Sequence, residues 1–141
     1  MVKAGSLSRC GRQQMASVLV IDDDPITRTV VGAVLESVGH IVSEAADGDT
    51  GLTTFSSILP DLVITDILMP GKDGIETIRE LRTINPGIKI IAISGDVPFD
   101  GPSILEAARL LGADEVMEKP FRNDQFLRIV AQLLGCNVRS F

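Results

Sequence analysis

The chain has 141 residues, a formal net charge of −6, two cysteines and one histidine. This length favours one domain that buries a core without disulfides, and the two distant thiols imply no disulfide framework. The negative charge disfavours non-specific binding to nucleic acid, and no apolar run approaches the ~20 residues of a membrane-spanning helix. We therefore expect a cytoplasmic protein without nucleic-acid or membrane partners, in which His40 is solvated.

The two ends of the chain differ from the rest. Residues 1–16 carry three basic side chains and no acidic one, and they lack the apolar segment of a secretory signal. We expect a flexible extension there, with Met15 as an alternative start of translation. Residues 17–135 would form a single domain, followed by a tail at 136–141 that is too short to fold alone. Because no output domain follows, we expect a stand-alone domain.

Short apolar runs alternate with helical patterns from the start of this domain. Residues 18–21 (VLVI) are apolar throughout, which is typical of a strand buried on both faces. Pro25 suits the first turn of a helix capped by Asp23 or Asp24, and Gly39 ends that helix. A spacing of four defines one apolar face of the helix: Ile26, Val30, Val34 and Val38. Residues 40–46 are expected to form the second strand.

The same alternation continues to the end of the domain. Helical patterns begin after Asp47-Gly48, at Ile75, at Ile104 and after a cap at Asn123 or Asp124. Their expected buried residues are Leu52, Phe55, Leu59, Ile75, Ile78, Leu81, Ile104, Leu105, Ala108, Leu111, Phe126, Ile129, Val130 and Leu133. The remaining strands are expected at residues 62–65, 89–94 and 115–118.

Five such strand–helix units predict an α/β fold, with a doubly wound parallel sheet of five strands and five helices on its two faces. Right-handed crossovers leave few topologies for such a chain. In these sheets ligands bind at the carboxyl ends of the strands. The residues that directly follow each strand are therefore the candidates for function.

Four of the five strand ends carry a polar group. The first strand ends in Asp22 and Asp23, the third in Asp66, the fourth in Ser94 and the fifth in Lys119. Two carboxylates ~4 Å apart repel by about 4 kcal/mol at an effective dielectric near 20, so either one carboxylate takes a proton or a cation joins the cluster. An oxygen-only site of this kind suits Mg²⁺.

These groups suit phosphoryl transfer, which depends on cations and hydrogen-bond donors around the transferred group. Asp66, alone on the central strand, is the candidate nucleophile, since a carboxylate can form an acyl phosphate. Asp22 and Asp23 on the neighbouring strand are the candidate metal ligands. Lys119 and Ser94 could each contact one phosphoryl oxygen.

With these residues in view, the chain resembles the response regulator receiver family of two-component signalling. The matching motifs are VLVIDDDP (18–25), LVITDILMPGKDG (62–74), IIAISGD (90–96) and EKPF (118–121), in the family's order and over roughly residues 17–134. The resemblance implies a flavodoxin-like sheet in the order 2-1-3-4-5.

The resemblance also assigns roles to individual residues. It makes Asp66 the phospho-acceptor and also a metal ligand, Asp22 and Asp23 the acidic metal pair, and the backbone carbonyl of Leu68 a further protein ligand for Mg²⁺, for which Mn²⁺ can substitute. Ser94 becomes the switch hydroxyl. Lys119 becomes the phosphate-binding lysine, in a Lys-Pro bond that is usually cis in this family.

The function implied is that of a switch rather than of an enzyme acting on other substrates. A sensor histidine kinase or a histidine phosphotransfer protein would supply the phosphoryl group, and the domain would catalyse only its own Mg²⁺-dependent phosphorylation and dephosphorylation. Phosphorylation would shift the face formed by the fourth helix, fifth strand and fifth helix. The readout would be a partner protein, a homodimer or onward transfer to another histidine.

Two positions depart from the family's pattern. Val116 stands where an aromatic residue often precedes the lysine by three, so the usual coupling of the hydroxyl to an aromatic rotamer cannot operate in that form. The loop after Ser94 is longer than usual and contains Phe99, which we expect to pack the loop. Leu68 and Asp96 occupy the positions that tune hydrolysis of the acyl phosphate in this family.

Three other functions share parts of this pattern. A degenerate receiver would have the same fold and bind partners without phosphorylation, which the intact set of acidic residues, serine and lysine argues against. A phosphatase of the haloacid dehalogenase type would use Asp22 as nucleophile and Asp24 as its partner, but Pro25 and Ile26 do not fit that motif. A flavodoxin-like flavin protein would need aromatic rings for stacking, and the chain has no Trp or Tyr.

Overall fold

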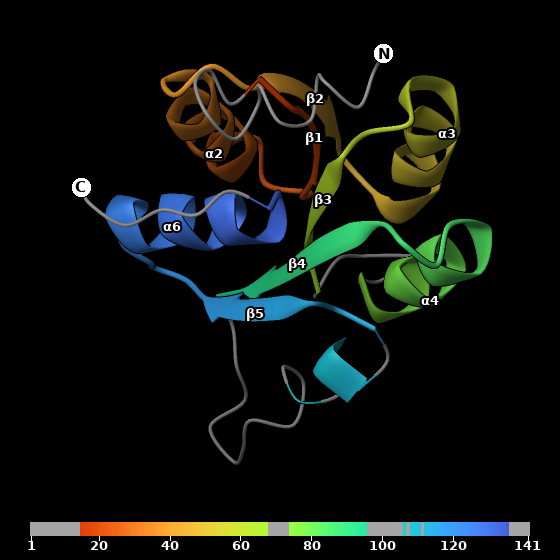
Figure 1. Cartoon of the computed structure of the whole chain (residues 1–141). Coiled ribbons are helices and arrows are strands. Elements are labelled where there is room, and N and C mark those ends of the chain that lie inside the picture. The colour runs from red at the N-terminus through yellow and green to blue at the C-terminus, as the bar shows by residue number, and fades with distance from the viewer. Residues whose placement is uncertain (1–14, 68–73, 96–105, 107, 111, 136–141) are drawn as a thin grey trace.

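The computed structural model describes residues 15–67, 74–95, 106, 108–110 and 112–135 (Figure 1). Its centre is a five-stranded parallel sheet in the order β2-β1-β3-β4-β5. The strands are β1 (Ser17–Ile21), β2 (Ile41–Ala45), β3 (Leu62–Asp66), β4 (Lys89–Ser94) and β5 (Glu115–Glu118). The helices with defined bounds are α2 (Pro25–Glu36), α3 (Gly48–Ile58), α4 (Gly74–Ile84) and α6 (Asn123–Leu133).

Glu106 and residues 108–110 are also helical and belong to the fourth of the five predicted helices. The predicted α/β class, the doubly wound topology and the strand order are therefore confirmed. Within the described parts of the chain, no helix is both long and apolar enough to span a bilayer.

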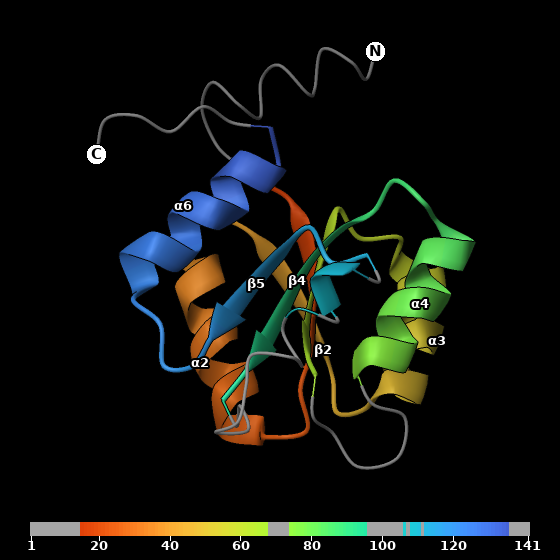
Figure 2. The same cartoon turned by 90° about the horizontal axis from the view of Figure 1, so that it is seen from below.

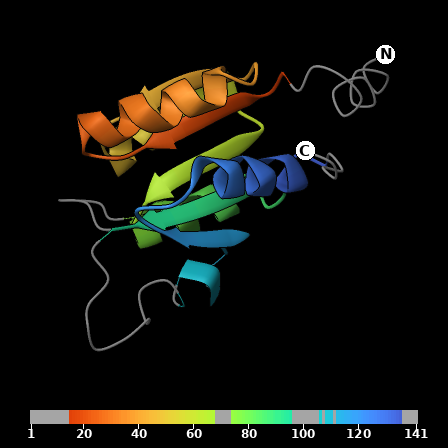
Figure 3. The same ribbon diagram turned by 90° about the vertical axis from the view of Figure 1, so that its left-hand side faces the viewer.

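The helices cover the two faces of the sheet in pairs. Figure 2 shows α2 and α6 on one side and α3 and α4 on the other, and Figure 3 shows α2 and α6 running across the same face. Alternate residues of β1 enter the two cores, since Val18 and Val20 pack with the α2 and α6 layer while Leu19 and Ile21 pack with the α3 and α4 layer. Burial on both faces explains why the central strands are apolar throughout.

The helix starts and ends follow local capping chemistry in most cases. Asp24 caps α2 by accepting a hydrogen bond from Ile26 N at 3.0 Å, as predicted. Asp47 caps α3 in the same way through Thr50 N at 2.8 Å. The predicted cap of α6 is wrong, because Arg122 occupies the cap position and makes no side-chain cap bond there.

The apolar face defined on the first helix is not the face that packs on the sheet. Ile26 is 71% exposed and Val30 53% exposed, whereas Val31 and Leu35 are buried. The two stripes are adjacent on the helix and both are apolar, so the sequence period alone did not distinguish them. The next helix also ends earlier than its apolar pattern, since Leu59 is a left-handed C-cap and is 70% exposed.

His40 is buried rather than solvated. The residue is 6% exposed, and its Nδ1 accepts a hydrogen bond from Ala16 N at 3.2 Å. The imidazole therefore joins the segment before β1 to the segment before β2, at the amino-terminal edge of the sheet.

Parallel pairing brings the functional candidates to the opposite edge. The register pairs Ile21 with Thr65 and Asp66 with Ile93. Asp22, Asp66 and Ser94 consequently lie at the carboxyl ends of three neighbouring strands. Lys119 joins them because its backbone N–H donates to Ser94 O at 2.9 Å, directly after β5.

Candidate functional site

Three carboxylates form a cluster at this edge. Each of Asp22, Asp23 and Asp66 offers an oxygen, and these oxygens all lie within 4.8 Å of one another. Asp22 is 0% exposed and Asp66 is 6% exposed, whereas Asp23 is exposed to solvent. The cluster is thus accessible to solvent at Asp23, whereas Asp22 and Asp66 are buried.

Asp22 is fixed by contacts to each of its polar groups. Its N–H donates to Ala45 O at 3.1 Å, which extends the pairing of β1 with β2 beyond the strand. Its carboxylate accepts from Asp24 N at 2.9 Å through Oδ1 and from Lys119 Nζ at 3.1 Å through Oδ2. A carboxylate with this little exposure needs such partners to remain charged.

Asp66 lies next to Asp22 and Lys119, and its carboxylate has fewer hydrogen-bond partners than that of Asp22. Its Oδ1 accepts from its neighbour's backbone, Ile67 N, at 2.9 Å, and its Oδ2 is 3.9 Å from Lys119 Nζ. Burial and, to a smaller extent, the charge of Asp22 raise the pKa of Asp66 from 3.8 to about 6, although the charge of Lys119 opposes both. The cluster thus carries more negative charge than one lysine compensates.

Ser94 contributes a hydroxyl without a partner. The residue is 0% exposed, and its Oγ has no hydrogen-bond partner among the described residues. Buried hydroxyls in native proteins are almost always bonded, so an orphaned one at a functional edge indicates a group that acquires its partner in another state.

Lys119 connects the parts of the site. The Lys119-Pro120 peptide bond is cis, as the family resemblance predicted. A Cβ at Gly95 would lie 3.4 Å from the Lys119 side chain, so the backbone after β4 packs closely against the stem of the lysine. Val116 is partly buried against the core on the α3 and α4 side of the sheet.

The donor set fits a hard divalent cation such as Mg²⁺. It consists of carboxylate oxygens, one exposed and two buried. Burial and the charge of Asp22 raise the pKa of Asp66, and a bound cation would favour its ionised form. The predicted third ligand, the carbonyl of Leu68, lies outside the described residues, as do Asp96 and Phe99.

Two residues that shape the site were not predicted from the sequence. Arg28 donates from Nη1 to the backbone carbonyl of Asp22 at 2.7 Å. Gly74 donates from its N–H to Ile67 O at 2.8 Å, and a Cβ there would lie 2.1 Å from Asp66 O. The glycine was visible in the GKDG sequence as a loop residue, but its close approach to Asp66 depends on how α4 returns to the sheet.

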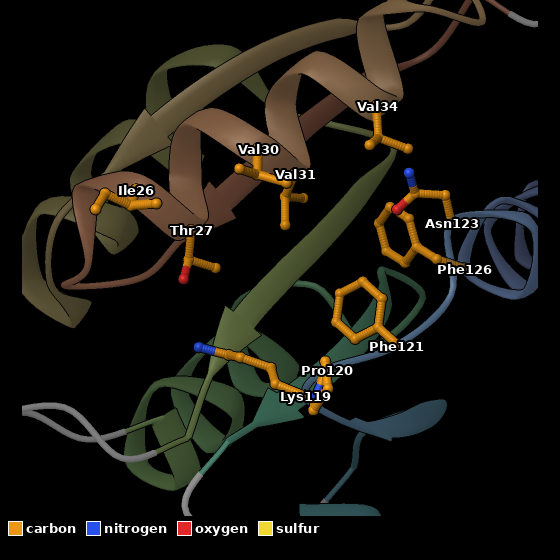
Figure 4. A pocket seen from close by; sticks show the side chains of 10 residues that line it. All are labelled: Ile26, Thr27, Val30, Val31, Val34, Lys119, Pro120, Phe121, Asn123 and Phe126. Carbon is orange, nitrogen blue, oxygen red and sulfur yellow. The ribbon is translucent and has the colours of Figure 1, made fainter.

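An apolar pocket lies beside the cluster, between α2 and the segment that connects β5 to α6 (Figure 4). Lys119 belongs both to this pocket and to the cluster. The pocket's other apolar walls come from Ile26, Val30, Val31, Val34, Pro120, Phe121 and Phe126. The rings of Phe121 and Phe126 stack with their centroids 5.1 Å apart, and both rings line the pocket on its α6 side.

Comparisons with known proteins agree with this geometry. A family model described as the response regulator receiver domain matches residues 18–131. Protein CcdB of Bacillus subtilis is 34% identical over 122 residues, which cover 86% of this chain and 99% of CcdB. The crystal structure of a CheY-like receiver domain protein from Methanospirillum hungatei has a TM-score of 0.79 at 25% identity, covering 85% of this chain and 94% of that one.

Other relatives are longer than this chain. The DNA-binding transcriptional regulator NtrC of Azospirillum brasilense is 32% identical over 86% of this chain, but the match covers 25% of NtrC. The chain spans about half the length of several further curated relatives. Because NtrC is named as a DNA-binding protein, the relatives do not support the expectation that nucleic acid plays no part. The chain belongs to the response regulator receiver domain family and is a signalling switch of two-component systems.

Proposed function

We propose that Asp66 accepts a phosphoryl group in a Mg²⁺-dependent reaction, from a sensor histidine kinase or a histidine phosphotransfer protein in the cytoplasm. The observation that carries the proposal is the state of Asp66 itself. Its carboxylate is nearly buried, its pKa is raised to about 6, and two further carboxylates and one lysine surround it. Such a perturbed carboxyl at a strand end is a candidate for chemistry rather than for stability.

The bond changes follow from the groups present. An oxygen of Asp66 attacks the phosphorus, the bond from phosphorus to the donor's histidine nitrogen breaks, and its electron pair remains on that nitrogen. A bound Mg²⁺ would neutralise charge on the phosphoryl oxygens, with Asp22, Asp23 and the Leu68 carbonyl as its proposed protein ligands. Lys119 Nζ, 3.9 Å from Asp66 Oδ2, would bind another phosphoryl oxygen.

Asp66 is a better nucleophile candidate than Asp22. Both carboxylate oxygens of Asp22 already accept hydrogen bonds, and the residue is 0% exposed. A phosphatase of the haloacid dehalogenase type would require Asp22 to attack, so this arrangement argues against that alternative.

The phosphorylated state would give Ser94 the partner that its buried Oγ lacks. An aspartyl phosphate adds close to two negative charges and three acceptor oxygens beside β4. Charge-assisted hydrogen bonds from Ser94 and Lys119, roughly 1.5–3 kcal/mol each, would then favour a second packing of the segment from the fourth helix to α6. We propose that this face, within a receiver unit at residues 17–135, controls a downstream partner protein or a homodimer.

The apolar pocket beside Lys119 is the surface we propose for the phosphoryl donor. A protein donor must bring its phosphohistidine to Asp66 and therefore contacts the rim of the cluster. Ile26 and Val30 are exposed on that rim, and Lys119 lines the pocket as well as the cluster. An exposed apolar rim of this kind next to a reactive group indicates an interaction site.

Intact-mass spectrometry tests the acceptor. We expect one phosphoryl adduct after incubation with acetyl phosphate and Mg²⁺, and no adduct in Asp66→Ala or after addition of EDTA. Because rapid hydrolysis could hide the adduct, the same proteins would be titrated with beryllofluoride and followed by NMR. If the wild type neither forms the adduct nor binds beryllofluoride, the phospho-acceptor function is wrong and a constitutive binding module becomes the better explanation.

A further inference from the structure

We infer that Arg28 is a positioning residue for the Mg²⁺ site. Through its bond to the backbone of Asp22, Arg28 sets the direction of the Asp23 carboxylate. The inference rests on the proposed Mg²⁺-dependent function and adds to the acidic residues a basic one that never contacts the ion. Among the described residues, Arg28 is the only one with a long side chain that donates to the Asp22 carbonyl oxygen, and the distance from Arg28 Nη1 to that oxygen is 2.7 Å.

Arg28 contacts the turn between β1 and α2 at both of its ends. Its side chain bonds Asp22 O, and its backbone N–H donates to Asp24 O at 3.0 Å, which starts the hydrogen bonding of α2. The three acidic residues of the turn therefore lie between two bonds made by one residue. A residue of α2 therefore holds the conformation of the loop between β1 and α2.

The bond to Asp22 O matters most for Asp23. That carbonyl belongs to the same rigid peptide plane as the N–H of Asp23, so fixing the carbonyl fixes the start of Asp23. Asp23 is exposed, and neither of its carboxylate oxygens has a hydrogen bond among the contacts described for this turn. Without Arg28, the exposed ligand would lose the contact that orients its backbone.

Glu44 on β2 orients Arg28 in turn. The Glu44 carboxylate accepts from Arg28 Nε at 3.2 Å, and the two side chains are 18% and 44% exposed for arginine and glutamate. The guanidinium thus uses separate nitrogens for the acidic turn and for its own support, a geometry that a single ammonium group does not reproduce.

Charge and geometry predict opposite effects when Arg28 is replaced. A positive charge beside the cluster repels Mg²⁺, so if charge alone acted, loss of the arginine would tighten Mg²⁺ binding. If Arg28 orients Asp23, its loss weakens binding, by roughly 10-fold or more as for other residues that orient metal ligands. The sign of the change therefore distinguishes the two roles.

The experiment measures Mg²⁺ affinity by NMR titration of backbone amides, because the chain has no Trp or Tyr for intrinsic fluorescence. The variants are Arg28→Gln, which loses charge and geometry, and Arg28→Lys, which keeps the charge alone. Lys89→Gln is the matched control, since Lys89 is an exposed cation at the amino end of β4, on the opposite edge of the sheet. Urea denaturation without Mg²⁺ reports whether each variant is folded.

We expect weaker Mg²⁺ binding in both Arg28 variants, by roughly 10-fold, and an unchanged affinity in Lys89→Gln. Wild-type or tighter affinity in Arg28→Lys would overturn the inference, and this variant decides alone if Arg28→Gln does not fold. If the wild type binds no Mg²⁺, the proposed function fails and the inference fails with it. Normal wild-type binding with unchanged Arg28 variants overturns only the inference.

Discussion

The ammonium group of Lys119 lies 3.1 Å from Asp22 Oδ2 and 3.9 Å from Asp66 Oδ2, so the lysine pairs more closely with Asp22 than with the proposed acceptor. One cation therefore serves two carboxylates unequally. Asp66 is left with a raised pKa, and Asp22 depends on Lys119 for its charge compensation. Binding of Mg²⁺ to the acidic pair would leave the lysine available for a phosphoryl group on Asp66.

Lys119→Met should destabilise the metal-free protein by about 2–3 kcal/mol, because the fully buried Asp22 carboxylate loses its charged partner. The loss should be smaller at saturating Mg²⁺, since the ion then compensates the same carboxylate. Urea denaturation with and without Mg²⁺ measures both values. Arg122→Met is the control, because the Arg122–Asp124 pair is largely exposed and should contribute little to stability. An equal loss for Lys119→Met in both conditions would contradict this account.

Asp66→Asn should stabilise the metal-free protein at pH 7. The pKa of Asp66 is raised from 3.8 to about 6 on folding, and at 1.36 kcal/mol per pKa unit the ionised folded state carries a cost on the order of 2–3 kcal/mol. This cost is full above about pH 6, decreases as the pH falls from 6 towards 3.8, and is absent below 3.8. The gain in Asp66→Asn should follow the same course.

Urea denaturation in EDTA over this pH range measures that difference. Glu36→Gln removes an equal charge from an exposed position at the end of α2 and should show no comparable gain. A destabilised Asp66→Asn protein, or a stability difference that does not change with pH, would show that burial and Asp22 do not strain the acceptor as described.

Ser94→Ala should leave the unphosphorylated protein as stable as the wild type or more stable by about 1 kcal/mol, because the buried Oγ has no partner to lose. The variant should still form the Asp66 adduct, but beryllofluoride should shift fewer amide resonances in β4, β5 and α6. Paired NMR spectra with and without beryllofluoride provide the measurement. A wild-type pattern of shifts in Ser94→Ala would exclude the hydroxyl from the switch.

Arg82→Met should destabilise the protein by about 3 kcal/mol or more without impairing phosphorylation. The guanidinium donates to the carbonyl oxygens of Gly112, Pro86 and Ile88 and to the Asp114 carboxylate, so its loss removes four hydrogen-bonded contacts, three of them partly buried. These contacts join α4 to the starts of β4 and β5, at the edge of the sheet opposite the acidic cluster. Denaturation curves and acetyl phosphate labelling of the folded fraction measure the two effects separately, and a stable variant with impaired labelling would contradict this division.

Ile26→Glu should slow phosphoryl transfer from a protein donor by roughly 10-fold, because a charge replaces apolar contact area on the proposed docking rim. Labelling by acetyl phosphate should be unchanged, since the small donor needs no docking surface. Ile84→Glu is the matched control, as Ile84 is similarly exposed at the end of α4, outside this pocket. Equal rates for both variants with the protein donor would place the donor elsewhere.

The alternation of apolar strands and helices was enough to predict the sheet, because strands buried on both faces cannot be polar and parallel strands require crossovers. The same rule predicted that Asp22, Asp66, Ser94 and Lys119 lie together, since residues that follow parallel strands share an edge of the sheet. Strands β4 and β5 have the bounds that the sequence predicted.

Other features required the tertiary structure. Two adjacent apolar stripes on α2 look alike in the sequence, and only packing on the sheet buried Val31 and Leu35 and left Ile26 exposed. Two contacts of Asp22 join residues from different elements. Lys119 pairs more closely with the Asp22 carboxylate than with that of Asp66, and Arg28 donates to the Asp22 carbonyl. Such pairings depend on differences of less than about 1 Å in the positions of side chains from separate elements, whereas the sequence determines only which strand end each residue follows.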